Sequence, residues 1–294
     1  MTMTYKIFGA DCAWCQRKNI VKGLETFGFI EGDGPKFIYA NDPGGYDEAL
    51  NYKLNFAIKP KLIYNIQDIP IHLKDFNIKG LIEKLRCADA ITTISEYTKD
   101  SVKRYCGYDS TVIYQPINNI YKLDQEIDIK YKSKLLIIGR FRDPNKRTML
   151  VLQAFRDLGV KPEEITAVGP DAGAIIDEPA LNCFYNGAEY VACAGKIEEL
   201  NLVICEALAA GAIPIVLSDC STREEFLPQK YFPEYAEIGN NSIDIAAFVS
   251  KLENNSAIKN EFKDRLYFHY KTNLEEKFKP TSVAKKIIET YWYS

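Results

Sequence analysis

Short apolar runs alternate with amphipathic stretches along the whole chain. In the first half, apolar and β-branched runs predict strands at 6–8, 36–39, 62–66, 90–94 and 111–114. Apolar residues at helical spacing predict helices between these strands, at 16–27, 46–55, 78–86 and 96–105. Such an alternation is typical of parallel sheets that are covered by helices on both faces.

The pattern is interrupted at 115–132, where Pro116, Asn118 and Asn119 precede scattered charges without periodicity. A second series then predicts strands at 135–138, 165–168, 181–185, 190–194, 213–217 and 235–238. Helices are expected at 148–158, 202–210, 242–253, 257–267 and 281–292. The sequence therefore predicts two α/β domains at 1–119 and 133–275, a linker at 120–132 and a C-terminal helix within 276–294.

Charge and hydropathy narrow the classes of protein. The 294 residues carry a formal net charge of −3, which gives no excess of positive charge for a nucleic-acid partner. No apolar run is as long as a membrane span, and the N-terminus lacks the basic and apolar regions of a signal peptide. We therefore expect a cytoplasmic protein. Peripheral contact with a membrane remains open, because an amphipathic helix leaves a weak trace in composition.

Most of the eight cysteines fall within predicted strands and helices, where a reduced thiol packs as a small apolar residue. Cys12 and Cys15 differ, because they form a Cys-x-x-Cys motif between a strand and an amphipathic helix. This arrangement resembles a glutaredoxin active site, in which Cys12 would gain thiolate character and Cys15 would resolve the mixed disulfide. That fold also needs a later cis-proline that faces the cysteines, followed by a strand and a pair of glycines. The prolines of this chain do not fall in that order at convincing spacing, so two ordinary thiols are favoured. A thiol–disulfide oxidoreductase stays an alternative.

Two glutamates flank the start of an apolar helix in the second half. Glu198 and Glu206 are eight residues apart, and Gly211 closes the helix. Carboxylates accept hydrogen bonds from sugar hydroxyls, and the amides at a helix N-terminus bind phosphate. Glu206 stands within the apolar run VICEALAA, where a charge must be exposed, paired or liganded, and we favour a ligand over a surface position. The stretch is suited to a nucleotide sugar.

Cations gather after the first strand of the second series. Gly139 and Arg140 follow the apolar run 135–138, and Lys146 and Arg147 stand at the start of the next helix. Open α/β sheets bind ligands at the carboxyl ends of their strands, and an arginine with a lysine there can hold a diphosphate. The alternative is a solvated loop. No Asp-x-Asp pair stands at a suitable strand end.

These motifs occur together in IIGRFRDPNKRTMLVLQAF, AVGP and EELNLVICEALAAGAIPIVLS, the last followed by TREE. The set resembles the C-terminal domain of retaining GT-B glycosyltransferases of family four. LIYNIQDIP and ITTISEYTKDSVKRYCGYDSTVIYQPIN resemble the N-terminal domain of that family more loosely. The resemblance implies an α/β GT-B fold with two Rossmann-like domains facing each other across a cleft. It also implies that the last helix packs back toward the N-terminal domain.

The resemblance assigns a role to each residue of the second-half motifs. Arg140 and Lys146, after Gly139, would bind the pyrophosphate of a nucleotide-sugar donor. Glu206 would hold the ribose hydroxyls. Glu198 would contact the hydroxyls of the transferred sugar near the reacting centre.

Further positions follow from the same resemblance. The backbone amides of Leu200, Asn201 and Leu202 would face the donor. Near the reaction centre the family usually has a histidine where this chain has Gln67, directly before Asp68.

His72 lies five residues after Gln67 and is a substitute for that histidine only if the loop shifts, so a structural role is favoured. The chain is also shorter between 170 and 186 than family members usually are. A nucleotide-sugar-binding protein without turnover is therefore a further alternative. The activity that the resemblance implies is transfer of a sugar to an acceptor hydroxyl of a glycan, lipid or protein, with retention of configuration and without a metal ion.

Overall fold

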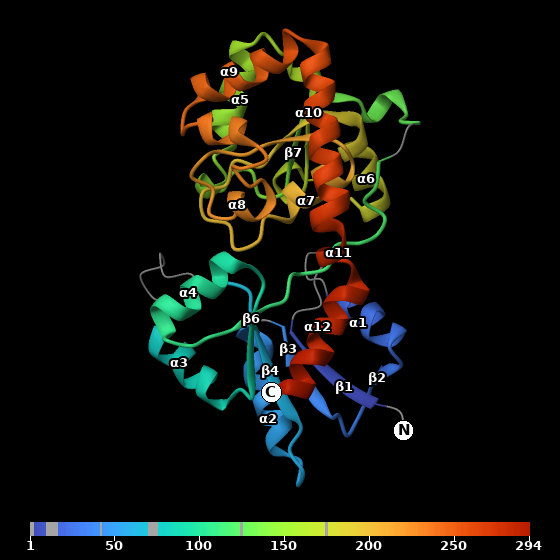
Figure 1. Cartoon of the computed structure of the whole chain (residues 1–294), viewed down its shortest axis with the longest axis vertical. Helices are drawn as coiled ribbons and strands as arrows, with labels where there is room; N and C mark the ends of the chain where they lie inside the picture. Colours follow the sequence, from blue (N-terminus) through green and yellow to red (C-terminus); the bar gives the residue numbers. More distant parts are fainter. Residues whose placement is uncertain (1–2, 10–16, 42, 70–75, 124–125, 174–175) are drawn as a thin grey trace. The chain divides into compact units, whose positions relative to one another are not determined.

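The computed structural model describes residues 3–9, 17–41, 43–69, 76–123, 126–173 and 176–294. The chain divides into two compact units. The first comprises Met1–Ile117 together with Lys277–Ser294, and the second comprises Asn118–Glu276. Each unit contains one parallel sheet with helices packed against it (Figure 1).

The first unit is built on six parallel strands. They are β1 (Met3–Phe8), β2 (Phe29–Glu31), β3 (Phe37–Ala40), β4 (Lys61–Ile66), β5 (Ala90–Thr93) and β6 (Thr111–Val112). Their order in the sheet is β2-β1-β3-β4-β5-β6. The helices are α1 (Arg17–Thr26), α2 (Pro43–Leu54), α3 (Ile78–Cys87), α4 (Glu96–Cys106), α11 (Glu275–Phe278) at the border of the units, and α12 (Pro280–Tyr293).

Alternate residues of β3 face the two layers of helices. Phe37 and Tyr39 belong to a buried cluster with α1 and α12, whereas Ile38 and Ala40 pack with α2, α3 and α4. A strand that is buried on both faces explains the continuous apolar run FIYA. The C-terminal helix therefore completes the core of the first unit, where it lies beside α1 (Figure 1).

The second unit contains four parallel strands in the order β10-β9-β7-β8. The strands are β7 (Ser133–Ile138), β8 (Ile165–Val168), β9 (Ala188–Ala192) and β10 (Ile213–Ile215). Its helices are α5 (Thr148–Asp157), α6 (Glu178–Gly187), α7 (Leu202–Ala209), α8 (Arg223–Phe226), α9 (Ser242–Glu253) and α10 (Ser256–His269). A π-helical segment, Tyr270–Leu274, continues from α10. Shorter single turns include η1 (Ile129–Tyr131), η2 (Pro144–Lys146), η3 (Pro162–Glu164), η4 (Pro170–Ala172) and η5 (Pro233–Glu237).

The segment expected to be a linker belongs to this second unit from Asn118 onward. Its backbone is attached to α6: Lys122 N donates to Asn182 Oδ1 at 3.2 Å, and Asn186 Nδ2 donates to Lys122 O at 2.8 Å.

Two predicted strands are wrong. The segment 181–185 lies in α6, because Asp177 caps the helix by accepting from Ala180 N at 2.9 Å and Pro179 occupies the first turn. The segment 235–238 follows Pro233 into η5 instead of a strand. The short strand β2 was not predicted, because its three residues carry no measurable alternation.

The second sheet grows from β7 in both directions, although all of its strands are parallel. From β7 the chain first moves to β8 on one side and then to β9 and β10 on the other. In open α/β sheets, such a switch point leaves a crevice at the carboxyl ends of the two neighbouring strands, here β7 and β9. No helix among the described residues is long and apolar enough to cross a membrane.

Candidate active site

The loops after β7 and β8 approach each other closely at two glycines. Gly139 N donates to Val168 O at 2.9 Å, and Gly169 has a φ of 121°. A Cβ atom at Gly169 would lie 2.7 Å from Gly139 N, so a larger residue there would displace the loop after β7. The position of Gly139 and of the cations that follow it depends on this contact.

Arg140 is exposed at the carboxyl end of β7. Its guanidinium forms no ion pair with any residue that the structure describes. Its loop is fixed through the neighbouring backbone, because Arg142 N donates to Asp171 Oδ2 at 2.6 Å. Arg140 is therefore an available cation on an ordered loop, as a phosphate ligand requires.

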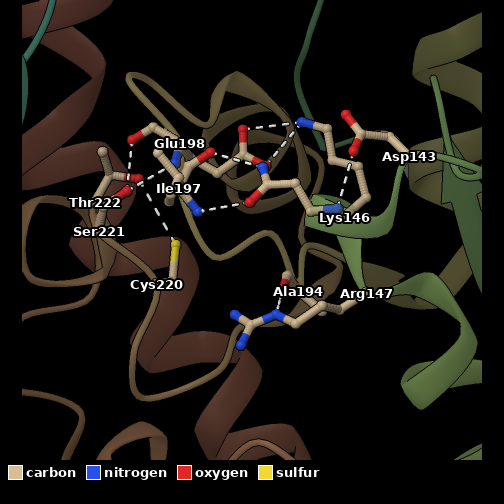
Figure 2. Close-up of polar contacts among 10 residues, drawn as sticks. Asp143, Lys146, Arg147, Ala194, Ile197, Glu198, Cys220, Ser221 and Thr222 are labelled. Atoms are coloured by element: carbon tan, nitrogen blue, oxygen red, sulfur yellow. Dashed lines mark hydrogen bonds and ion pairs between the residues drawn. The ribbon is translucent and has the colours of Figure 1, made fainter. Parts of the chain in front are cut away.

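Lys146 and Glu198 form an ion pair at the switch point. Lys146 Nζ lies 2.8 Å from Glu198 Oε1 and 2.9 Å from Oε2 (Figure 2). The side chain of Glu198 is 9% exposed and that of Lys146 is 37% exposed. The carboxylate is thus almost enclosed by protein, while water reaches the ammonium group.

Two polar side chains hold the backbone that carries Glu198. On one side, Asn145 pairs with Ile197: its Nδ2 donates to Ile197 O at 2.8 Å, and its Oδ1 accepts from Ile197 N at 3.0 Å. On the other side, Ser221 Oγ accepts from Glu198 N and donates to Glu198 O, both at 2.7 Å (Figure 2). The short segment is fixed from η2 and from the loop after β10, although it has no regular secondary structure.

Gly195 leaves the space into which the Glu198 side chain folds. A Cβ atom at Gly195 would lie 1.8 Å from Glu198 Oε1, so any side chain there would displace the carboxylate. Position 195, at the start of GKIEELNL, therefore requires a glycine so that the Glu198 side chain has room.

Arg147 is held by protein groups at Nε and Nη1, whereas its Nη2 is buried without a hydrogen-bond partner among the described residues. It is the one described non-glycine residue with a positive φ, 50°, at the N-terminus of α5. Its Nε donates to Ala194 O at 2.7 Å, and its Nη1 lies 2.8 Å from Asp219 Oδ1 and 2.7 Å from Asn240 Oδ1. Of the two adjacent cations predicted for a diphosphate, only Lys146 is placed toward the glutamates.

Glu206 is buried in α7 and receives a hydrogen bond from Tyr185 of α6. Tyr185 Oη donates to Glu206 Oε2 at 2.5 Å. Burial raises the pKa of Glu206 to about 7; the tyrosine bond opposes this rise, and the nearby Glu178 adds to it. No lysine or arginine of the described chain forms an ion pair with this carboxyl. The environment is one in which a ligand hydroxyl would be a favourable partner.

Cys193 directly follows β9 and is buried. Burial raises the pKa of the Cys193 thiol, the carboxylates Glu198 and Glu206 raise it further, and Lys146 opposes them.

The N-terminus of α7 is partly occupied by its own chain. Leu202 N donates to Leu200 O at 3.0 Å, so this amide is engaged within the protein. The amides of Leu200 and Asn201 have no hydrogen-bond acceptor among the described residues. Two of the three predicted amides thus keep a hydrogen-bond donor without an acceptor in the described part of the chain.

Gln67 and Asp68 lie in the first unit, after β4. Gln67 Nε2 donates to the backbone oxygen of Asn41, the residue after β3. Asn41 Oδ1 also accepts from Asn65 Nδ2 at 3.2 Å, and Thr92 Oγ1 donates to Asn65 Oδ1 at 3.0 Å. This buried chain fixes Gln67 at the carboxyl edge of the first sheet.

Asp68 follows in the same loop, and its Oδ1 atom is buried without a partner among the described residues. His72, Cys12 and Cys15 lie outside the described residues. No three His, Cys, Asp or Glu side chains of the described part are grouped so that they could hold a metal ion.

Comparison with known proteins gives a consistent result for the fold. No family model and no curated protein matches the sequence. Sucrose-phosphate synthase from Thermosynechococcus elongatus is similar over 99% of this chain and 98% of its own, with a TM-score of 0.74 and 12% identity. WaaG, a glycosyltransferase of lipopolysaccharide biosynthesis, is similar over 97% and 99%, with a TM-score of 0.66 and 10% identity. The chain has the GT-B fold.

An α-glucosyltransferase bound to UDP-glucose and DNA is a further GT-B match, with a TM-score of 0.60 and 10% identity over 99% of this chain and 98% of its own. The predicted α/β GT-B architecture is therefore confirmed over the full length. The neighbouring proteins are glycosyltransferases, but identities of this size establish the fold only.

Sequence reasoning missed three residues that shape the site: Tyr185, Asn145 and Ser221. Tyr185 could have been found, because Asp177, Glu178 and Pro179 form a helix-start signature that argues against a strand. Nothing in the sequence marks Asn145 or Ser221, since each acts on a backbone segment far away in the chain.

Proposed function

We propose that the protein is a glycosyltransferase that moves a sugar from a nucleotide-sugar donor to an acceptor hydroxyl, with retention at the anomeric carbon and without a metal ion. The observation that carries the proposal is the ion pair of Lys146 and Glu198 at the switch point of a GT-B domain, with Glu206 buried in the helix α7 that follows. Cations and carboxylates in one crevice match a ligand that has both phosphates and hydroxyls.

Each end of the donor has a matching group in the second unit. Arg140 and Lys146 supply positive charge for the diphosphate. Glu206 accepts hydrogen bonds from the ribose, and Glu198 accepts them from the transferred sugar. Binding requires that Lys146 leaves or shares its contact with Glu198, because the lysine is directed at the carboxylate in the free protein.

The reaction breaks the bond between the anomeric carbon and the leaving phosphate oxygen, and forms a bond from that carbon to the acceptor oxygen. The proton of the acceptor hydroxyl passes to the leaving phosphate oxygen, so no protein base is required for retention. Arg140, Lys146 and the amides of Leu200 and Asn201 stabilise the charge that develops on the diphosphate. Fixed cations thereby take the task that a bound Mg²⁺ performs in other phosphate sites.

The first unit is proposed to bind the acceptor. Gln67 cannot act as a base, because a carboxamide takes up no proton near neutral pH; its carboxamide oxygen can accept a hydrogen bond from a sugar hydroxyl. Asp68, with its unpartnered buried oxygen, is a second acceptor of hydrogen bonds from such a hydroxyl. A glycan, lipid or protein acceptor fits the net charge of −3 better than DNA, which one GT-B neighbour binds.

Thermal unfolding of the purified chain with nucleoside diphosphates and nucleotide sugars tests the proposal, each with and without EDTA. A ligand that binds the folded state alone raises the melting temperature. We expect a rise with one nucleotide family that EDTA leaves unchanged, together with slow hydrolysis of the matching nucleotide sugar. A rise that EDTA abolishes contradicts metal independence. Binding without hydrolysis or transfer to any acceptor indicates a protein without turnover, and no rise with any nucleotide contradicts the donor site.

A further inference from the structure

The buried phenol of Tyr185 stands directly beside the carboxyl that is proposed to hold the ribose. Tyr185 is 0% exposed and Glu206 is 9% exposed. The hydroxyl lies 2.5 Å from Glu206 Oε2, the short distance of a charge-assisted O–H···O⁻ bond. Because Tyr185 is on α6 and Glu206 on α7, the bond connects two helices.

We infer that Tyr185 is a positioning residue for the nucleotide site, because its hydroxyl fixes the orientation and the charged form of the Glu206 carboxylate that receives the ribose. The inference rests on the proposed function. A phenol donates one hydrogen, and it donates that hydrogen to the carboxylate. A carboxylate with one oxygen fixed presents its other oxygen in a defined direction, which reduces the entropy lost when a hydroxyl binds.

The neighbours of Glu206 show why the tyrosine is required. The titratable groups that interact electrostatically with the carboxyl are Tyr185 and Glu178 of α6, Tyr121 of the segment before η1, Cys193 after β9, and Cys205 on α7 itself. None of them is a cation. Tyr185 is thus the group among them that donates a hydrogen bond to the carboxylate, and it opposes the burial that favours the protonated acid.

The consequence is a coupling between pH and nucleotide binding. The carboxylate form of Glu206 accepts hydrogen bonds at both oxygens, whereas the acid has lost part of that capacity. Affinity for the nucleotide therefore falls as the pH decreases through about 7, where Glu206 takes up a proton. Removal of the Tyr185 hydroxyl raises the pKa of Glu206 further, so the midpoint of this fall moves to higher pH.

The test compares Tyr185→Phe with the parent chain by titration calorimetry between about pH 5.5 and pH 9. The probe is whichever of uridine, guanosine and adenosine diphosphate binds the parent most tightly. We expect Tyr185→Phe to weaken binding about tenfold near neutral pH and to approach the parent at the alkaline end.

Two control variants separate the effect from other causes. Tyr235→Phe removes an equally buried hydroxyl of the same unit, which donates to Pro214 O at 2.8 Å, and should leave the pH profile unchanged. Glu206→Gln should remove the part of the pH dependence of nucleotide affinity that comes from Glu206. The titration of the nucleotide phosphate should then be the remaining cause of a pH dependence. If Tyr185→Phe does not fold, a 3-fluorotyrosine at position 185 serves instead: its more acidic phenol should move the midpoint to lower pH.

An equal loss of affinity at every pH, or no loss, overturns the inference, because a purely structural role of Tyr185 would not move the midpoint. That outcome leaves the proposed function intact as long as the parent binds a nucleoside diphosphate. If the parent binds none of the three, the proposed function fails and this inference fails with it.

Discussion

Lys146 Nζ donates to both carboxylate oxygens of Glu198, at 2.8 and 2.9 Å, so the cation and the anion proposed for opposite parts of the donor neutralise each other in the free protein. The pair prevents an isolated charge from remaining in a nearly enclosed position before substrate binds. A donor that brings both phosphates and hydroxyls replaces each partner of the pair at the same time. A nucleoside diphosphate without a sugar replaces only one.

Replacement of Lys146 tests this mutual neutralisation. Lys146→Met leaves the Glu198 carboxylate without its cation, and the free energy of unfolding should fall by about 1 kcal/mol. The loss is smaller than for a fully buried pair, because water screens a lysine that is 37% exposed. Denaturant unfolding measures the loss. The double variant Lys146→Met/Glu198→Gln should recover most of it, and a loss that the second substitution does not reduce contradicts the coupling.

Replacement of Arg140 tests the contribution of the exposed cation to turnover. Arg140→Ala should lower the rate of sugar transfer by about two to three orders of magnitude, because the charge on the leaving diphosphate loses its planar ligand. The melting temperature should not change, since Arg140 forms no ion pair with the described residues. Arg142→Ala is the matched control, because Arg142 is equally exposed two residues further on. Similar rates in the two variants would show that Arg140 has no special role.

A methyl group at Gly195 tests the placement of Glu198. Its Cβ would lie 1.8 Å from Glu198 Oε1, so Gly195→Ala should displace the carboxylate and lower turnover about a hundredfold or more. The fold should persist, because the carboxylate can move toward solvent beside Lys146. Gly32→Ala is the control: no atom lies within 4 Å of a Cβ there, so activity should be unchanged. Parental activity in Gly195→Ala means that Glu198 does not contact the reacting sugar.

The sequence predicted the fold well where local signals and burial agree. The strand at 62–66 is a largely apolar run that becomes a buried parallel strand, and the helix at 242–253 begins after an Asn241 cap. The segment 181–185 failed for the opposite reason. Its apolar run suggested a strand, while the helix-start residues Asp177 and Pro179 lie just outside the run.

The sequence names candidate residues for a site, but it does not give their geometry. The spacing of Arg140, Lys146, Glu198 and Glu206 was visible in the sequence, and all four lie in the second unit, where Lys146 and Glu198 are paired. The Lys146–Glu198 pair and the Tyr185–Glu206 bond were not predictable, because they join residues that are far apart in the sequence. The separation is 52 residues for the first and 21 residues for the second. Arg147 differs from Lys146 in its partners for the same reason, because it contacts Asp219 and Asn240, which are also distant in the sequence.

Burial of Glu206 should make the protein less stable as pH rises. The pKa of Glu206 is about 7 in the folded protein and about 4.5 in the unfolded chain, where the carboxyl is in water. Below about pH 4.5 the carboxyl is protonated in both states and costs nothing. Between these values the folded state binds more protons than the unfolded state, so the free energy of unfolding falls as pH increases. Above about 7 the full penalty is present, at most about 3 kcal/mol.

Glu206→Gln removes the titration and keeps an oxygen that can accept from the Tyr185 hydroxyl. The variant should therefore be more stable than the parent above about pH 7, and this advantage should vanish toward about pH 4.5. The new amide hydrogens need partners in a buried place, so the gain should be about 1 kcal/mol rather than the full penalty. Nucleotide affinity should fall in the same variant, because the ribose loses a charged acceptor.

Denaturant unfolding of the parent and the variant across this pH range provides the measurement, and Glu253→Gln gives a control of opposite sign. Burial opposes the ionisation of Glu253, but hydrogen bonds from Lys134, Lys259 and Tyr190 outweigh it and lower the pKa of Glu253 to about 2. Ionised Glu253 therefore stabilises the fold above about pH 4.5, and its replacement should reduce stability there. If Glu206→Gln also reduces stability at high pH, the Glu206 carboxylate stabilises the fold. That result contradicts the interpretation of Glu206 as a buried acceptor for a ligand.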